Sequence, residues 1–210
     1  MIKAVIFDLD GVIVSTDDCH YRAWKKMADE EGIYFDREIN NRLRGVSRMA
    51  SLDIVLERAD KEYSESEKQA LAERKNNYYK ELICELTPGD ILPGAMETLE
   101  KLKKNDIKIA IGSSSKNTPI ILEQIGLDRY FDAVSDGNNI THSKPDPEVF
   151  LKAAEMLKIA PGDCMIVEDA DAGIEAGTRA GMRTLSVHGA KGADFATEDL
   201  ASCDIWACLK

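Results

Sequence analysis

The sequence predicts an α/β fold, in which a three-layer, doubly wound core is built on a parallel β-sheet and carries an inserted all-helical cap. Two observations lead to this prediction. Short, continuously apolar runs alternate with helical patterns, which is typical of a parallel sheet that is buried on both faces. The alternation stops between about residues 17 and 86, where the pattern is helical throughout. Right-handed crossovers between successive strands would place helices on both sides of the sheet.

The expected strands are short apolar runs that are each followed by polar residues. They are residues 4–7, 107–111, 165–167 and 184–187, with the pair Ala133-Val134 as a shorter possibility.

The helices of the core are marked by residues that start or stop a helix. Thr118-Pro119 predicts an N-cap followed by the first helical residue, and Asp146-Pro147 opens a second helix. A third, short helix is expected over residues 173–180, with Gly181 forming its C-terminal turn.

The helical stretch is expected to form a separate domain. We assign residues 16–87 to a helical cap, and residues 1–15 and 88–210 to the catalytic core. Ser64-Glu65-Ser66-Glu67 has the pattern of a capping box and should open the last cap helix. Caps inserted at the mouth of an α/β sheet often close over the substrate and exclude water.

Composition excludes several classes of protein. The 210 residues are 44% apolar and 31% charged, and no apolar stretch approaches the roughly 18 residues of a membrane span. A strand-like run begins at residue 4, which leaves no room for a signal peptide. The net charge of −11 argues against a nucleic-acid partner, and five scattered cysteines predict neither disulfides nor a zinc site. We expect a cytoplasmic monomer with no membrane partner.

Polar residues follow four of the predicted strands, at the sheet edge where open parallel sheets bind ligands. Asp8-Leu9-Asp10-Gly11 follows the first strand, Ser113 to Asn117 the second, Lys144 the third and Glu168-Asp169 the fourth. Each segment alone has an ordinary explanation as a loop, a helix entry or a solvated charge. Their occurrence together at four strand ends predicts an active site.

The residue types in this set suit phosphoryl transfer. Clustered carboxylates repel one another unless a cation offsets their charge, and oxygen ligands at a phosphate site favour magnesium. Asp8 is a candidate nucleophile that would form an aspartyl phosphate. Asp10 lies two residues further on and can reach the same reacting group. Lys144 and the Ser113 hydroxyl would hold the negative charge of the transferring phosphoryl group.

The segment from Phe7 to Val12, Phe-Asp-Leu-Asp-Gly-Val, resembles the signature of the haloacid dehalogenase superfamily. The later motifs stand in the order of that superfamily, and the resemblance extends over essentially the whole chain. It implies that Asp8 is the nucleophile and Asp10 the general acid and base. It also implies that magnesium is held by Asp8, by the backbone carbonyl of Asp10 and by Asp169, with Glu168 nearby or coordinating. Ser15 and Ala170 depart from the usual pattern, at the hinge and beside the acidic pair respectively.

The cap residues resemble those of the β-phosphoglucomutase family. In that family the equivalents of His20 and Lys75 position Asp10 or bind the sugar, and the equivalent of Arg48 grips the phosphate that is not being transferred. Taken alone, Trp24 could be a core residue and Arg48 a solvated surface charge. The expected substrate-binding residues are Thr16, His20, Trp24, Gly45, Val46, Ser47, Arg48, Lys75, Ser114, Ser115, Lys116 and Asn117.

This resemblance implies an isomerase that interconverts β-D-glucose 1-phosphate and glucose 6-phosphate. The reaction would pass through β-glucose 1,6-bisphosphate and an aspartyl phosphate on Asp8. The alternative is a magnesium-dependent phosphatase of the same superfamily, acting on sugar phosphates or phosphoglycolate, which would not need Arg48 and Lys75. A non-catalytic sugar-phosphate sensor is disfavoured because both Asp8 and Asp10 are present.

Overall fold

The computed structural model describes residues 1–43 and 47–210, and these residues form two compact units. One unit comprises Met1–Ser15 with Thr87–Lys210, and the other comprises Thr16–Leu86. The second boundary lies one residue before the expected one. Thr87 groups with the core because its backbone N–H and its hydroxyl both donate to the Asp90 carboxylate, at 2.7 and 2.9 Å.

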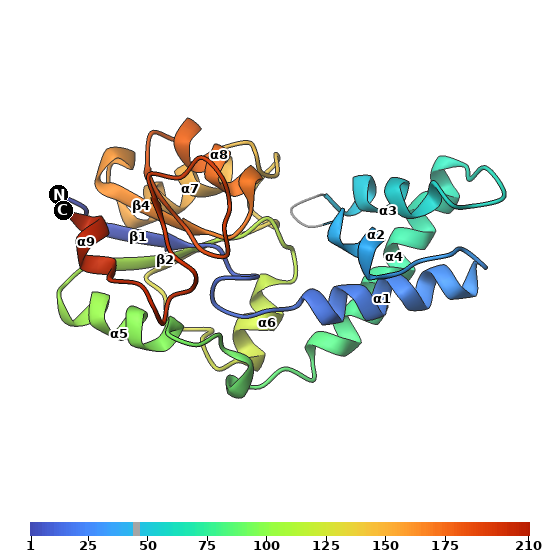
Figure 1. Cartoon of the computed structure of the whole chain (residues 1–210), viewed down its shortest axis with the longest axis horizontal. Coiled ribbons are helices and arrows are strands. Elements are labelled where there is room, and N and C mark those ends of the chain that lie inside the picture. The colour runs from blue at the N-terminus through green and yellow to red at the C-terminus, as the bar shows by residue number, and fades with distance from the viewer. Residues whose placement is uncertain (44–46) are drawn as a thin grey trace. The chain divides into compact units, whose positions relative to one another are not determined.

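The core unit contains a six-stranded parallel sheet with the strand order β3-β2-β1-β4-β5-β6, as Figure 1 shows in part, and this confirms the predicted fold class. The sequence pattern did not predict β6, because its two residues are too few to form a recognisable apolar run. The strands are β1 (Ala4–Phe7), β2 (Lys108–Gly112), β3 (Ala133–Ser135), β4 (Cys164–Glu168), β5 (Arg183–Ser186) and β6 (Phe195–Ala196).

Helices cover both faces of this sheet. α7 (Glu148–Leu157) and α8 (Asp171–Arg179) pack on one face, where Ala4 and Ile6 of β1 contribute to a buried apolar cluster. α5 (Ala95–Lys104) covers the other face (Figure 1). The core unit also contains α6 (Thr118–Gln124), α9 (Ile205–Leu209) and the short 3-10 helices η1 (Pro88–Asp90) and η2 (Pro161–Asp163).

Two of the expected helix boundaries can be compared closely. α6 begins at Thr118 itself, with Asn117 as the N-cap, so the predicted cap is wrong by one residue. The reason is that the Thr118 hydroxyl donates to the Ser115 carbonyl at 2.9 Å and does not cap the helix. α8 is followed by Gly181 in the left-handed region at φ 71°, as expected.

The regular structure in the described part of Thr16–Leu86 is helical. The helices are α1 (Asp17–Glu30), α2 (Arg37–Asn41), α3 (Arg48–Leu56) and α4 (Glu65–Ile83), and α1 packs against α4. Ser64 and Glu67 form the predicted capping box: Glu67 accepts from the Ser64 backbone at 2.8 Å, and the Ser64 hydroxyl accepts from Glu67 N–H at 3.4 Å. None of the helices described is both long and apolar enough to cross a membrane.

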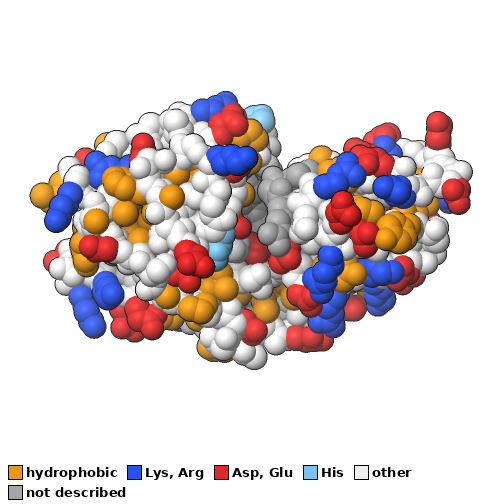
Figure 2. Space-filling model, viewed as in Figure 1, with side chains coloured by type: hydrophobic (Ala, Val, Ile, Leu, Met, Phe, Trp, Pro, Cys, Tyr) orange, Lys and Arg blue, Asp and Glu red, His pale blue; other side chains and the backbone are white. Residues whose placement is uncertain are grey.

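Charges of both signs are interspersed on the face shown in Figure 2. Several charged side chains of the helical unit are paired, such as Arg42 with Glu57 and Lys68 with Asp53, each at 2.8 Å.

Candidate active site

The loop after β1 presents Asp8 and Asp10. The Asp8 backbone N–H donates to the Val167 carbonyl at 2.9 Å, which continues the pairing of β1 with β4, and Asp8 is 8% exposed. Gly11 follows with φ +83°, and a Cβ at this position would lie 2.1 Å from Asp169 Oδ2. The glycine therefore allows both the turn and the close approach of Asp169 to the loop.

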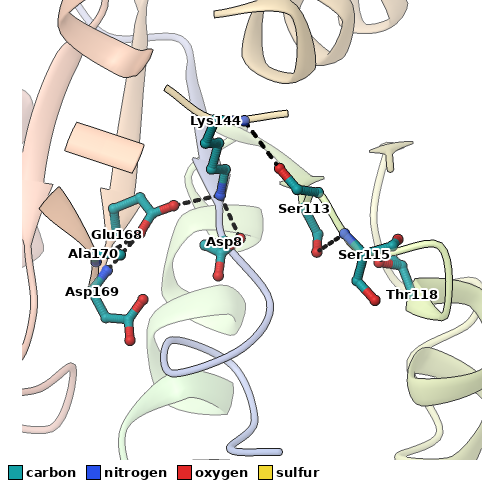
Figure 3. Close-up of polar contacts among 9 residues, drawn as sticks. Asp8, Ser113, Ser115, Thr118, Lys144, Glu168, Asp169 and Ala170 are labelled. Carbon is teal, nitrogen blue, oxygen red and sulfur yellow. Dashed lines mark hydrogen bonds and ion pairs between the residues drawn. The ribbon is translucent and has the colours of Figure 1, made fainter. Parts of the chain in front are cut away.

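Lys144 contacts two carboxylates, that of Asp8 in the loop after β1 and that of Glu168 at the end of β4. Its Nζ lies 2.6 Å from Asp8 Oδ1 and also donates to Glu168 Oε1, as Figure 3 shows. The side chains of Lys144 and Glu168 are 9% and 1% exposed, so this ion cluster is shielded from water. Burial alone would lower the pKa of Lys144, but Asp8 and Glu168 outweigh it and raise the pKa above its usual value. The lysine is therefore a fixed positive charge beside Asp8.

Glu168 is oriented by the backbone that follows it. Its Oε2 accepts the N–H groups of Asp169 and Ala170, each at 2.9 Å, while its Oε1 faces Lys144. The carboxylate occupies the space beside Gly173 in the first turn of α8, where a Cβ would lie 1.9 Å from Glu168 Oε1. Gly173 is therefore part of the packing that holds the ion cluster.

Asp8, Glu168 and Asp169 form a cluster of oxygen donors that suits a hard divalent cation. Their nearest carboxylate oxygens all lie within 4.8 Å of one another. Burial, with the neighbouring carboxylates, raises the pKa of Asp8 to about 7 and that of Asp169 to about 8, against the opposing attraction of Lys144. These carboxylates repel one another, and a bound cation would relieve that repulsion.

The loop after β2 carries the serines. The Ser113 hydroxyl accepts from Ser115 N–H at 3.2 Å, and the Ser114 hydroxyl accepts from Lys144 N–H at 3.3 Å. Ser114 thus links this loop to the Lys144 loop. Asn117 is buried, whereas Lys116 is exposed and its carbonyl accepts from Asn138 Nδ2 at 3.0 Å.

The helical unit gathers a second set of the predicted residues. Lys75 is 3% exposed, and its Nζ lies 2.8 Å from His20 Nδ1. Trp24 is also buried, and Lys75 Nζ lies over its ring, 4.8 Å from the centroid. Thr16 is fully buried and accepts from the Tyr79 hydroxyl at 2.9 Å. The packing of α1, with its N-cap Thr16, against α4 therefore brings Thr16, His20, Trp24 and Lys75 into one cluster.

Arg48 and Ser47 lie at the start of α3. Arg48 is exposed, yet its charge helps to lower the pKa of His20, after the larger effects of burial and Lys75. The Ser47 hydroxyl accepts from Ala50 N–H at 3.4 Å and so caps the helix. The predicted residues Gly45 and Val46 lie outside the described residues.

The sequence analysis missed two residues in these clusters. Tyr79 follows Lys75 by four positions on α4, and this spacing places them on one helix face. Gly173 was interpreted only as a helix start, although a glycine in the first turn after an acidic pair is a signal of close packing.

Comparisons with known proteins agree with this arrangement. A family model described as haloacid dehalogenase-like hydrolase matches residues 2–181. β-Phosphoglucomutase of Bacillus subtilis (strain 168) is 47% identical over 188 residues, which cover 89% of this chain and 83% of that protein. The crystal structure of β-phosphoglucomutase from Clostridium difficile aligns with a TM-score of 0.90 at 43% identity, covering 99% of this chain and 95% of that one.

A phosphorylated carbohydrates phosphatase of Thermotoga maritima is 31% identical, over 88% of this chain and 84% of that protein. The higher identity to the Bacillus subtilis β-phosphoglucomutase extends over nearly the same share of this chain. The chain therefore belongs to the haloacid dehalogenase-like hydrolases and, within them, to the β-phosphoglucomutase family of isomerases.

Proposed function

We propose that this protein interconverts β-D-glucose 1-phosphate and glucose 6-phosphate through β-glucose 1,6-bisphosphate, with Asp8 carrying the phosphate between them. The observation that carries the proposal is the buried cluster of His20, Trp24 and Lys75 in the helical unit. A phosphatase for small phosphates needs only the core cluster, whereas a mutase must also bind the rest of a bisphosphate. The 47% identity to the Bacillus subtilis β-phosphoglucomutase supports the same function.

The chemistry begins with attack by the Asp8 carboxylate on the phosphorus of the bisphosphate. The bond from phosphorus to the sugar oxygen breaks, and Asp10 gives its proton to that oxygen. In the reverse direction Asp10 removes the proton from a sugar hydroxyl, whose oxygen attacks the aspartyl phosphate and releases Asp8. Lys144 and the Ser113 hydroxyl stabilise the negative charge on the transferring group.

The cofactor in this proposal is magnesium. Asp8, the backbone carbonyl of Asp10 and Asp169 would hold it, with Glu168 nearby. When bound, magnesium offsets the charges of the carboxylates and of the phosphate, which would otherwise repel the attacking oxygen.

We assign substrate recognition to residues of the helical unit and to the serine-containing loop after β2. His20 and Lys75 position Asp10 or bind the sugar, and Arg48 binds the phosphate that is not being transferred. Thr16, Trp24, Ser47, Ser114, Ser115, Lys116 and Asn117 complete the described part of the proposed substrate-binding set. The protein is proposed to act as a monomer in the cytoplasm.

The function is tested by measuring glucose 6-phosphate formation in a coupled assay, with β- and α-glucose 1-phosphate compared as substrates. The proposal expects turnover of the β anomer, primed by glucose 1,6-bisphosphate, and little turnover of the α anomer. The second candidate is a sugar-phosphate phosphatase, which the Thermotoga maritima relative favours. Release of inorganic phosphate from sugar phosphates, without any glucose 6-phosphate, would establish that candidate.

Replacing Arg48 by Ala is expected to lower kcat/KM for β-glucose 1-phosphate by about one to two decades, the effect of losing a charge-assisted hydrogen bond. Hydrolysis of acetyl phosphate should change little, because this small substrate has no second phosphate. The matched control is Arg37→Ala, which removes an exposed arginine of the same unit that pairs with Asp18. Equal losses of both activities in Arg48→Ala would assign Arg48 a structural role.

Replacing Gly173 by Ala is expected to lower kcat by about tenfold or more, because the added Cβ would displace the Glu168 carboxylate from Lys144. Alanine usually stabilises a helix relative to glycine by about 1 kcal/mol, so a loss here would come from the overlap. Gly177→Ala in the same helix is the control, because the atoms nearest to its added Cβ are side-chain carbons of Ile166 and Thr184 and not the Glu168 carboxylate. We expect Gly177→Ala to lower the Tm without lowering kcat. Unchanged kcat in Gly173→Ala would exclude this positioning role.

A further inference from the structure

The buried cluster of the helical unit contains Tyr79, a tyrosine that the proposed reaction does not use. Tyr79 is 2% exposed, and its neighbours include His20, Thr16 and Lys75. Its ring stacks on His20 with centroids 4.1 Å apart and planes tilted by 32°, and its hydroxyl donates to Thr16 Oγ1 at 2.9 Å. Lys75 Nζ lies over the same ring, 4.7 Å from its centroid.

The protonation state of Lys75 determines which group donates the hydrogen bond between Lys75 and His20. An ammonium group has only hydrogens to donate, so a charged Lys75 requires a bare lone pair on His20 Nδ1. A neutral amine could instead accept a hydrogen bond from Nδ1–H. Lys75 Nζ lies over two aromatic rings, those of Trp24 and Tyr79, and aromatic faces attract the charged form. Lys75 is therefore the donor.

The direction of this hydrogen bond determines which nitrogen of His20 carries the proton. Burial lowers the pKa of His20 well below its usual value, and Lys75 and Arg48 lower it further, so the ring is neutral. With Nδ1 accepting, its single proton must lie on Nε2. His20 then has a donor N–H group at Nε2, while the lone pair of Nδ1 is engaged by Lys75 and does not act as a base.

We propose that Tyr79 is a positioning residue that holds His20 as the Nε2–H tautomer, by stabilising Lys75 as an ammonium and by fixing Thr16, the N-cap of α1, through its hydroxyl. Thr16 is the residue before α1, and its carbonyl accepts the His20 backbone N–H at 2.9 Å. The Tyr79 hydroxyl thus fixes the start of the helix that carries His20, while the Tyr79 ring fixes the imidazole. This inference rests on the proposed function for the role of His20 in catalysis, but the tautomer itself does not depend on it.

The tautomer is measured by long-range ¹H–¹⁵N NMR of labelled protein at pH 7. The chain has three histidines, so His142→Gln and His188→Gln assign the His20 signals. We expect the Nε2–H pattern for His20 in the wild type, and loss of that single pattern in Tyr79→Leu and in Lys75→Met. Tyr78→Phe is the matched control: the neighbouring hydroxyl donates to Glu30, away from His20, and the spectrum should not change.

Kinetics separate the two contributions of Tyr79. Tyr79→Phe keeps the ring and should retain the tautomer, but loss of the Thr16 contact should lower mutase kcat by about tenfold. Tyr79→Leu should lower kcat by about a hundredfold, the usual effect of misplacing a group by about 1 Å. Acetyl phosphate hydrolysis should be retained in both variants.

An Nδ1–H pattern in the wild type would overturn the proposal, as would an unchanged tautomer in either Tyr79→Leu or Lys75→Met. If Tyr79→Leu does not fold, the wild type and Lys75→Met still decide the tautomer, and Tyr79→Phe still tests the hydroxyl. Because the NMR pattern requires no turnover, it also distinguishes failure of this inference from failure of the proposed function.

Discussion

Replacing Asp8 by Asn is expected to abolish both turnover and phosphorylation of the enzyme while the fold is retained. The change exchanges one carboxylate oxygen for an amide nitrogen, so the shape is kept and the nucleophile is lost. Asn keeps an oxygen that can accept from Lys144, and it removes a buried negative charge that lies near Glu168 and Asp169. The fold should therefore tolerate it.

Phosphorylation is measured as the mass increase of the intact protein after incubation with acetyl phosphate, and the fold by the thermal unfolding curve. Asp10→Asn is the matched control, because it changes the partner carboxylate of the same loop in the same way. It should still be phosphorylated on Asp8, but transfer to and from sugar hydroxyls should slow by about two to four decades. If Asp8→Asn were still phosphorylated on another residue, the proposed mechanism would have to be abandoned.

The core cluster could be predicted because parallel strands end at one edge of their sheet. Asp8, Lys144 and Glu168 are far apart in the sequence, yet each follows an expected strand, and the structure places them in hydrogen-bonding contact. Beyond the parallel arrangement, the only feature of the strand order that this cluster needs is that β1 and β4 are neighbours. Any parallel arrangement that makes β1 and β4 neighbours brings Asp8 and Glu168 together.

The contacts within the helical unit and the role of Gly173 could not be predicted, because they depend on side-chain packing. The sequence indicates that His20 and Trp24 share a helix face, but not that the face lies against α4, where Lys75 and Tyr79 are. The role of Gly173 likewise becomes apparent only when the position of the Glu168 carboxylate is known. Helical periodicity shows which side chains share one face of a helix. It does not show which helix faces pack against one another in the folded protein.

Removal of magnesium is expected to eliminate mutase activity, and restoring it should recover the activity. Asp8, Glu168 and Asp169 bring several negative charges together, and an anionic substrate would add to them. Calcium should restore little activity, because it prefers longer bonds and more ligands than magnesium. Activity is measured in excess chelator and after addition of each cation. Full activity in excess chelator would exclude the proposed site.

The same site makes magnesium binding depend on pH. In the metal-free fold the pKa values of Asp8 and Asp169 are raised to about 7 and about 8, mainly by burial, well above the usual value for an aspartate carboxyl. A raised pKa contributes stability at low pH that is lost as the pH rises through the folded value. The metal-free protein should therefore lose stability from these groups between about pH 4 and pH 8. Magnesium requires the ionised carboxylates, so its stabilising effect should grow over the upper part of this range.

We expect the increase in Tm caused by magnesium to be larger at pH 8 than at pH 6. Asp169→Asn should remove most of this increase, because it deletes one carboxylate of the proposed site. Asp146→Asn is the matched control, since Asp146 belongs to a separate cluster with His142 and Glu148 on the core unit. An equal increase at both pH values would mean that the carboxylates at Asp8 and Asp169 are already ionised at pH 6. An increase that depends on Asp146 and not on Asp169 would move the metal site away from the nucleophile, and the role of magnesium in phosphoryl transfer would then have to be rejected.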